Sequence, residues 1–93
     1  MKSIIQEEKE CYITHGTEDL HEHHIFFGKN RKLSEKYGLK VWLTYEYHES
    51  DKGVHGKNGH GLDMLLKSVA QREFEKTHTR QEFMQIFGKN YLD

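Results

Sequence analysis

Proline is absent from the 93 residues of this sequence, and cysteine occurs once, at Cys11. A single cysteine excludes a disulfide within the chain, yet a domain of this size often needs a disulfide, a metal or a partner for stability. The sequence also lacks a signal-peptide pattern and any long apolar run, so we expect a cytoplasmic protein without a membrane segment. Because a disulfide is excluded, a bound metal ion is one way in which this small domain could gain stability.

An excess of charge of one sign is missing too, since the formal net charge is -1. This balance excludes a strong overall attraction to nucleic acid, because phosphate binding depends on clustered Lys and Arg. The basic residues are unevenly spread, however, and one group lies at Lys29, Arg31, Lys32, Lys36 and Lys40. Such a run is either a patch for phosphate contacts or, more commonly, a solvated surface.

The chain shows no repeat, low-complexity tract or linker-like segment, which indicates a single folding unit. Residues 1–10 are mostly charged or polar and are predicted to form an N-terminal arm. The domain itself is then expected over residues 11–93.

Three segments have the composition of strands. β-branched and aromatic residues predict strands at residues 11–13 and 20–27. Alternation of apolar with other residues predicts a half-buried strand at residues 39–45. The polar segment 28–38, bracketed by glycines, is predicted as a long loop, and such loops in small domains are often functional.

The second half of the chain has helical patterns. Apolar residues recur at helical spacing through residues 62–77, which predicts a helix there. Thr79 and Glu82 have the spacing of a capping box and predict the start of another helix, which Gly88 is placed to end. Strands followed by helices indicate the α+β fold class.

Eight histidines are more than a core of this size needs, although each alone could be an ordinary surface or turn residue. His23 and His24 are neighbours in a predicted strand, so their side chains should point to opposite faces. One of them could bind a metal while the other acts as a base. His48 is expected at the end of the next strand, and His55 follows in a glycine-rich segment. Neutral imidazole is both a common metal ligand and a base suited to neutral pH.

Four segments occur in an order typical of one nuclease class: LHEHHIFFGKNRKLSEKYGL, VWLTYEYH, GVHGKNGHGLDMLLK and TRQEFMQIFGKNYL. Together they resemble the HNH endonucleases, and more closely the small phage HNH proteins grouped with the RecA-dependent, recombination-enhancing nucleases. The resemblance covers about residues 11–92. It implies a small α+β domain with a ββα-metal core, made of a two-stranded antiparallel hairpin and a helix, and an additional C-terminal helix.

The same resemblance implies a metal-dependent DNA endonuclease, encoded by a phage or prophage, that leaves 5′ phosphate and 3′ hydroxyl ends. His24 matches the general base that takes a proton from the attacking water. His23, His48 and His55 match the ligands of a single divalent metal ion. Imidazole ligands suit Zn, Ni, Co or Mn, whereas Mg held mostly by histidine would be weakly bound.

Some positions leave alternatives open. His60 is an alternative for the last ligand, because the glycines around it leave the local geometry undetermined. His21 is expected near the metal as a strand residue or an outer partner rather than as a ligand. Leu39 occupies the position of the HNH asparagine, and Asn30 or Ser34 could instead orient the base.

Relatives of this type often carry a pair of CxxC motifs that bind a structural zinc. The corresponding positions in this chain are Cys11, Thr14, Thr44 and Tyr47, so that zinc is expected to be absent. Cys11 is then predicted to be a small buried apolar residue.

DNA is the expected partner, with phosphate contacts predicted at Lys29, Arg31, Lys32, Lys40 and Lys57. Sequence specificity is expected to be low, with a recombinase filament or another phage or host protein as a further partner, and a homodimer could cut both strands. The alternative reading, favoured by the missing asparagine, is a catalytically weak or inactive HNH-fold module that binds nucleic acid or a protein. A third reading is a metal-free interaction protein, whose stability chelators would not change.

Overall fold

Two antiparallel strands, β1 (Leu20–His24) and β2 (Lys40–Thr44), form the sheet in the computed structural model, which describes residues 1–92. In their register His23 lies opposite Val41, and His24 lies opposite Lys40. The other elements are η1 (Gly28–Asn30), α1 (Arg31–Tyr37), α2 (Tyr45–His48), α3 (His60–Phe74) and α4 (Arg80–Phe87). The protein is therefore a small α+β domain in which a two-stranded antiparallel sheet precedes the main helices, as the sequence predicts.

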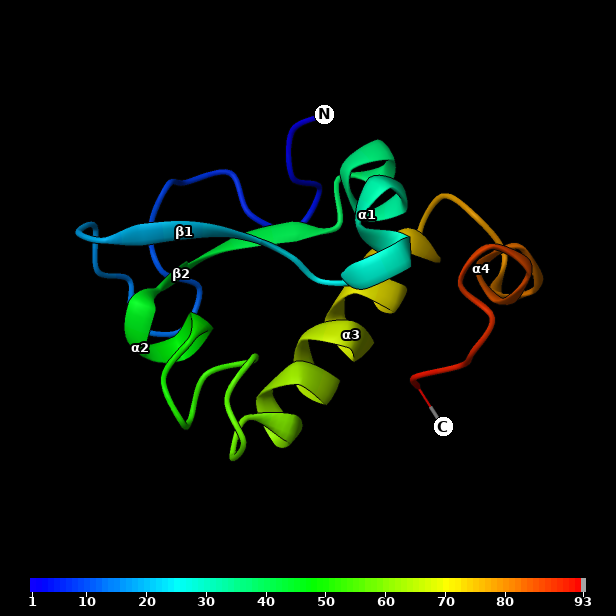
Figure 1. The fold of residues 1–93 in the computed structure, drawn as a ribbon. Helices are drawn as coiled ribbons and strands as arrows, with labels where there is room; N and C mark the ends of the chain where they lie inside the picture. Colours follow the sequence, from blue (N-terminus) through cyan, green and yellow to red (C-terminus); the bar gives the residue numbers. More distant parts are fainter. Residues whose placement is uncertain (93) are drawn as a thin grey trace.

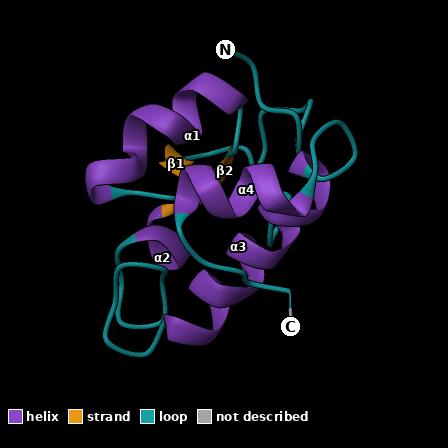
Figure 2. Ribbon diagram, turned by 90° about the vertical axis from the view of Figure 1, so that its right-hand side faces the viewer, coloured by secondary structure: helices purple, strands orange, loops and turns teal. Residues whose placement is uncertain are grey.

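The helices surround the sheet on several sides. α1 and α2 lie at opposite ends of the strands, and α3 runs diagonally beneath them with α4 beyond its far end (Figure 1). Viewed after a quarter turn, the two strands lie between α1 and α3 (Figure 2). No helix within residues 1–92 is long and apolar enough to cross a membrane.

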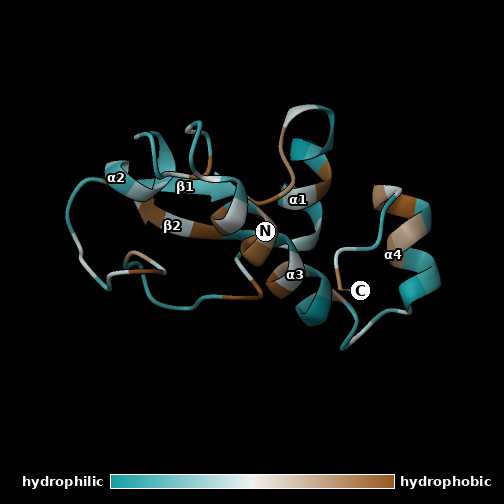
Figure 3. Ribbon diagram, turned by 90° about the horizontal axis from the view of Figure 1, so that it is seen from below, coloured by the Kyte–Doolittle hydropathy of each residue, from teal (hydrophilic) through white to brown (hydrophobic). Residues whose placement is uncertain are grey.

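One core joins the sheet to the helices. β2 is visibly more hydrophobic than β1, whose residues include three histidines and a glutamate (Figure 3). Aromatic rings from three parts of the chain meet in this core. Phe26 lies 4.5 Å from Phe87 of α4, and Phe74 of α3 lies 5.5 Å from Phe83, between ring centroids. The buried apolar residues are Cys11, Ile25, Phe26, Leu39, Val41, Leu43, Val54, Leu66, Ala70, Phe74, Phe83 and Phe87.

Both predicted helices are confirmed. α3 covers most of the segment expected to be helical and begins two residues earlier, at His60. The hydroxyl of Thr79 accepts a hydrogen bond from the Glu82 amide, and the Glu82 carboxylate accepts one from the Thr79 amide, so the capping box is present. Gly88 ends α4 in the left-handed conformation, at φ 80°.

Two other predictions are wrong. The polar segment 28–38 is not a loop, because it contains η1 and α1 and ends at Gly38 with φ 70°. Residues 11–13 do not form a strand, and the first sheet strand ends at His24 rather than at residue 27. Beyond His24, the Phe26 amide and carbonyl both bond to the hydroxyl of Ser34, which takes the place of a strand partner.

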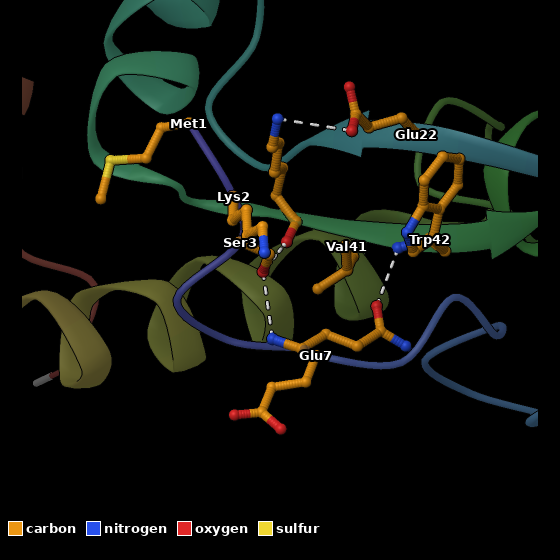
Figure 4. A pocket seen from close by; sticks show the side chains of 9 residues that line it. Met1, Lys2, Ser3, Glu7, Glu22, Val41 and Trp42 are labelled. Carbon is orange, nitrogen blue, oxygen red and sulfur yellow. Dashed lines mark hydrogen bonds and ion pairs between the residues drawn. The ribbon is translucent and has the colours of Figure 1, made fainter.

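The N-terminal arm packs along the open edge of β2. The Ile4 amide donates to the Gly38 carbonyl at 2.9 Å, and the Gln6 side-chain oxygen accepts from the Trp42 amide at 2.9 Å. An open groove of about 850 Å³ lies between arm and sheet, with Glu22, Val41 and Trp42 along it (Figure 4). The arm thus covers hydrogen-bonding groups that an edge strand would otherwise expose.

Candidate metal centre

Three histidines from different segments converge beside β1. His23 comes from the strand, His48 from the last residue of α2, and His55 from the loop that follows. Their ring centroids lie 5.2 Å (His23 to His48), 5.2 Å (His23 to His55) and 4.8 Å (His48 to His55) apart. One possible ligand atom from each ring lies within 4.8 Å of the other two, so these three residues, here called the histidine triad, could bind a metal ion.

Local backbone geometry brings the last two histidines together. α2 follows β2 without a loop, which places His48 at the end of the helix rather than at the end of the strand, contrary to expectation. The loop then returns along α2, since the His55 amide donates to the His48 carbonyl at 3.1 Å. A Cβ atom at Gly59 would collide with the Gly53 carbonyl, and one at Gly56 would collide with the Ser50 carbonyl. Glycine is therefore required where this loop crosses itself.

His23 is the buried member of the triad, with 1% of its surface exposed. Its Nε2 atom is buried and has no hydrogen-bond partner among residues 1–92. An unsatisfied buried polar atom costs about 1–3 kcal/mol, and coordination of a metal ion by this ring would remove such a cost. The unpartnered Nε2 of His23 therefore fits the role of a metal ligand.

Burial also keeps two rings of the triad, His23 and His48, uncharged. Desolvation, followed by repulsion from His48 and His55, lowers the pKa of His23 to about 3. Burial, with His55 and His21 next, lowers the pKa of His48 as well. Metal binding requires neutral imidazole, so both rings are in the binding form at neutral pH.

The two alternative histidines occupy different places. His21 lies on the same side of β1 as His23, and its Nδ1 is 3.0 Å from Nδ1 of His48, so one ring donates and the other accepts. His21, His48 and Glu49 form a second group that could hold a metal. His60 is exposed at the first residue of α3 and belongs to none of the groups of three found in residues 1–92.

His24 turns to the opposite face of the strand, where it joins a network of charges. Its Nε2 lies 2.8 Å from Oε1 of Glu35 on α1. The same carboxylate accepts from Nζ of Lys40 at 3.0 Å and from the amino terminus of Met1 at 2.7 Å. That amino group, then His24 and Lys40, hold the pKa of Glu35 well below its usual range. Glu22 completes a third possible metal group here, although Lys40 already supplies a cation 3.4 Å from it.

The residues expected to orient His24 do not contact it. The hydroxyl of Ser34 is fully buried, and its hydrogen bonds within residues 1–92 all go to the Phe26 backbone. No hydrogen bond joins the Asn30 side chain to His24 within residues 1–92. Glu35 contacts the His24 ring instead. The sequence did not point to Glu35, because residues 31–37 were expected to be part of a loop and not of a helix. A helix signal was present, since Leu33 and Tyr37 are four residues apart and Gly38 follows.

The predicted phosphate contacts separate into two groups. Lys29, Arg31, Lys32 and Lys57 are exposed, the first three on η1 and α1. Lys40 is buried and paired with Glu35 and Glu22, so it is not free to contact a phosphate. This pairing arises because the neighbours of Lys40 on the sheet and on α1 are acidic.

Two of the four positions that the resemblance compares with zinc-binding cysteines, Cys11 and Thr44, lie in contact. Cys11 is fully buried, as expected, and its Sγ lies 3.8 Å from Oγ1 of Thr44.

Comparison with known proteins gives no further guide. No family model, curated protein or solved structure matches the chain. The functional argument therefore depends on the residues of the histidine triad and on their surroundings.

Proposed function

We propose that this protein is a metal-dependent endonuclease that hydrolyses phosphodiester bonds in DNA, with its metal held by the histidine triad. One observation carries the proposal: three imidazoles from separate segments converge within 4.8 Å, in the order and spacing along the chain that resemble an HNH nuclease. The buried, unpartnered Nε2 of His23 supports a ligand role.

The donor set favours some ions over others. Three neutral imidazoles suit Zn, Ni, Co or Mn better than Mg, which prefers oxygen ligands. His55 is exposed, so the triad can be approached from solvent on its side. A divalent ion bound there would stabilise negative charge that develops on the phosphate oxygens.

His24 is the proposed base, as the resemblance implies. Its Nε2 pairs with Glu35, which leaves Nδ1 to take a proton from water. A carboxylate that holds an imidazole ring in this way fixes its orientation and its tautomer, so Glu35 would do the work of the missing asparagine. A general base must come within hydrogen-bond distance of the proton that it takes. His24 is the last residue of β1 and is adjacent to His23, but its ring lies on the other face of the strand, so the attacking water would have to bind at this end of the strand. The alternative base on the triad side is His21.

Substrate binding is proposed to use the exposed cations Lys29, Arg31, Lys32 and Lys57. Contacts of this kind are made to phosphates and carry no sequence information, so we propose low intrinsic specificity. A recombinase filament or another phage or host protein would then select the DNA.

Plasmid nicking tests the proposal. Supercoiled and single-stranded DNA are incubated with protein and Mn, Mg, Ni or Zn, and wild type is compared with His24→Gln and His21→Gln. His15→Gln is the matched control, because His15 is exposed, pairs with Glu10, and belongs to none of the possible metal groups found in residues 1–92. We expect metal-dependent nicking by wild type and His15→Gln that His24→Gln loses. Loss in His21→Gln alone would move the base to the triad face.

The binding-module reading makes a different prediction. A folded, metal-loaded wild type that binds DNA but never cleaves it, with any of the ions, would contradict the nuclease proposal and favour a module without catalysis. If chelators changed neither stability nor DNA binding, the metal-free reading would stand instead.

A further inference from the structure

One cation near the triad is unlike the exposed lysines of η1 and α1. Lys67 lies on α3, and its Nζ is 2.9 Å from Oδ2 of Asp63 one turn earlier. Only 13% of the Lys67 side chain and 10% of the Asp63 side chain are exposed. Buried ion pairs are often no more stable than apolar residues of similar volume, so packing alone does not explain this pair.

A phenylalanine connects Lys67 to the triad. The Lys67 ammonium lies 4.7 Å from the centroid of the Phe27 ring. That ring is in turn 4.8 Å from His55 and 6.0 Å from His23 between centroids. The ammonium charge also contributes to the lowered pKa of His23, after burial and the neighbouring histidines. The Phe27 ring, in contact with both, therefore links this positive charge to the triad.

The hydrogen bonding of the pair is incomplete. An ammonium has three donors, and Asp63 is the only hydrogen-bond partner of Lys67 within residues 1–92. Asp63 is 7% exposed, and its Oδ1 is buried without a partner among the described residues. One carboxylate oxygen thus fixes the ammonium, and donors of Lys67 remain for an anion.

We infer that Lys67 is a phosphate-binding residue of the triad site, held in place by Asp63. It would donate a charge-assisted hydrogen bond to a nonbridging oxygen of a phosphate group next to the triad, with Phe27 beneath its side chain. The inference rests on the proposed function for the identity of the substrate as a phosphodiester. Anion binding itself can be measured without any cleavage.

Inorganic phosphate is the probe, titrated into Zn-loaded protein by calorimetry. Lys67→Met keeps the apolar stem without the charge, and Lys67→Arg keeps the charge. Lys76→Met is the matched control, because Lys76 lies just beyond the end of α3, is exposed, and pairs with Glu73. We expect Lys67→Met to weaken phosphate binding about 10–100-fold, the usual strength of one hydrogen bond to a charged group. Lys67→Arg should retain most of the affinity, and Lys76→Met should match wild type.

Equal phosphate affinity in wild type and Lys67→Met would overturn the inference, and so would a metal-loaded wild type that binds no phosphate. If Lys67→Met does not fold, the ammonium resonances of wild type serve instead, and phosphate should shift that of Lys67 and not that of Lys76. Nicking by wild type separates the two proposals. If wild type nicks DNA but its phosphate binding does not depend on Lys67, only the inference about Lys67 is wrong. If phosphate binding depends on Lys67 but wild type nicks no DNA, only the nuclease proposal is wrong.

Discussion

His23 and His24 are consecutive residues of β1, and their rings have different surroundings. His23 is surrounded by other imidazoles, has a buried nitrogen without a partner, and is held neutral. His24 meets a carboxylate, a lysine and the chain terminus through Glu35. Strand alternation alone separates the two rings, so one histidine pair can supply a metal ligand on one face and an ion-paired ring on the other.

This difference suggests a division of work between the two faces. Within residues 1–92 no acidic side chain pairs with the buried His23 ring, and a metal ion would compensate for this. The His24 face is already balanced, since Lys40 and the amino terminus offset Glu35. Changes on the His24 face should therefore lower catalysis and leave metal affinity unchanged, whereas changes on the His23 face should first lower metal affinity.

The largest expected effect is on catalysis, from His24→Gln. We expect kcat for plasmid nicking to fall about 10²–10⁴-fold, the usual contribution of a general base. Metal stoichiometry, measured on the same preparations by inductively coupled plasma mass spectrometry, should remain that of wild type. Loss of metal together with activity would contradict the separation of the two faces.

The next effect is on metal affinity, from His55→Ala. Substitutions of residues that merely support a ligand weaken metal binding about 10–100-fold, so loss of a ligand should exceed about 100-fold. His60→Ala provides the matched control, because both histidines are exposed and lie five positions apart around the same glycine-rich loop. Calorimetric titration with Zn should show the loss for His55→Ala only. A larger loss for His60→Ala would exchange their roles.

A smaller effect concerns the helix that carries Glu35. Ser34→Ala leaves the buried Phe26 amide and carbonyl without their shared partner, and we expect the free energy of unfolding to fall by about 1–3 kcal/mol. Asn30→Ala, at the start of the same helix, should change it by less than about 0.5 kcal/mol. Urea denaturation measures both. Unchanged stability in Ser34→Ala would mean that this hydroxyl does not anchor α1.

The last effect, small within any single pH unit, is a pH dependence on the His23 face. The pKa of His23 is about 3 in the folded chain, against 6.5 as its ordinary value, so the unfolded chain binds more protons between these values. The free energy of unfolding of the metal-free protein should be constant above pH 6.5 and fall by about 1.4 kcal/mol for each pH unit between that value and the pKa of His23 in the folded chain, about 3. Denaturation at several pH values should show a shallower slope in His23→Gln than in His24→Gln. Equal slopes would show that His23 does not set the dependence.

Local rules account for part of the fold and the site. The opposite orientation of His23 and His24 follows from strand alternation, and α4 follows from its capping box and Gly88. The three histidines of the triad were selected by motif order along the chain, and the fold brings those same three together.

Other features depend on tertiary structure that no local pattern encodes. α1 was missed because glycines on both sides of a short charged segment are typical of a loop, and Glu35 was missed with it. Lys67 lies within an apolar helical pattern, and only the packing of α3 against Phe27 brings it near the triad. His55 could not be separated from His60 because backbone contacts between glycines shape the loop.

The most direct test of the metal centre is a titration of the metal-free protein with Co²⁺, followed by its visible absorption. Wild type and His24→Gln should each bind one equivalent, with d–d bands of low-coordinate Co²⁺ that Zn displaces, whereas His23→Gln should show no such bands. If His23→Gln gave the wild-type spectrum, or if wild type gave none, the histidine triad would not be the metal centre.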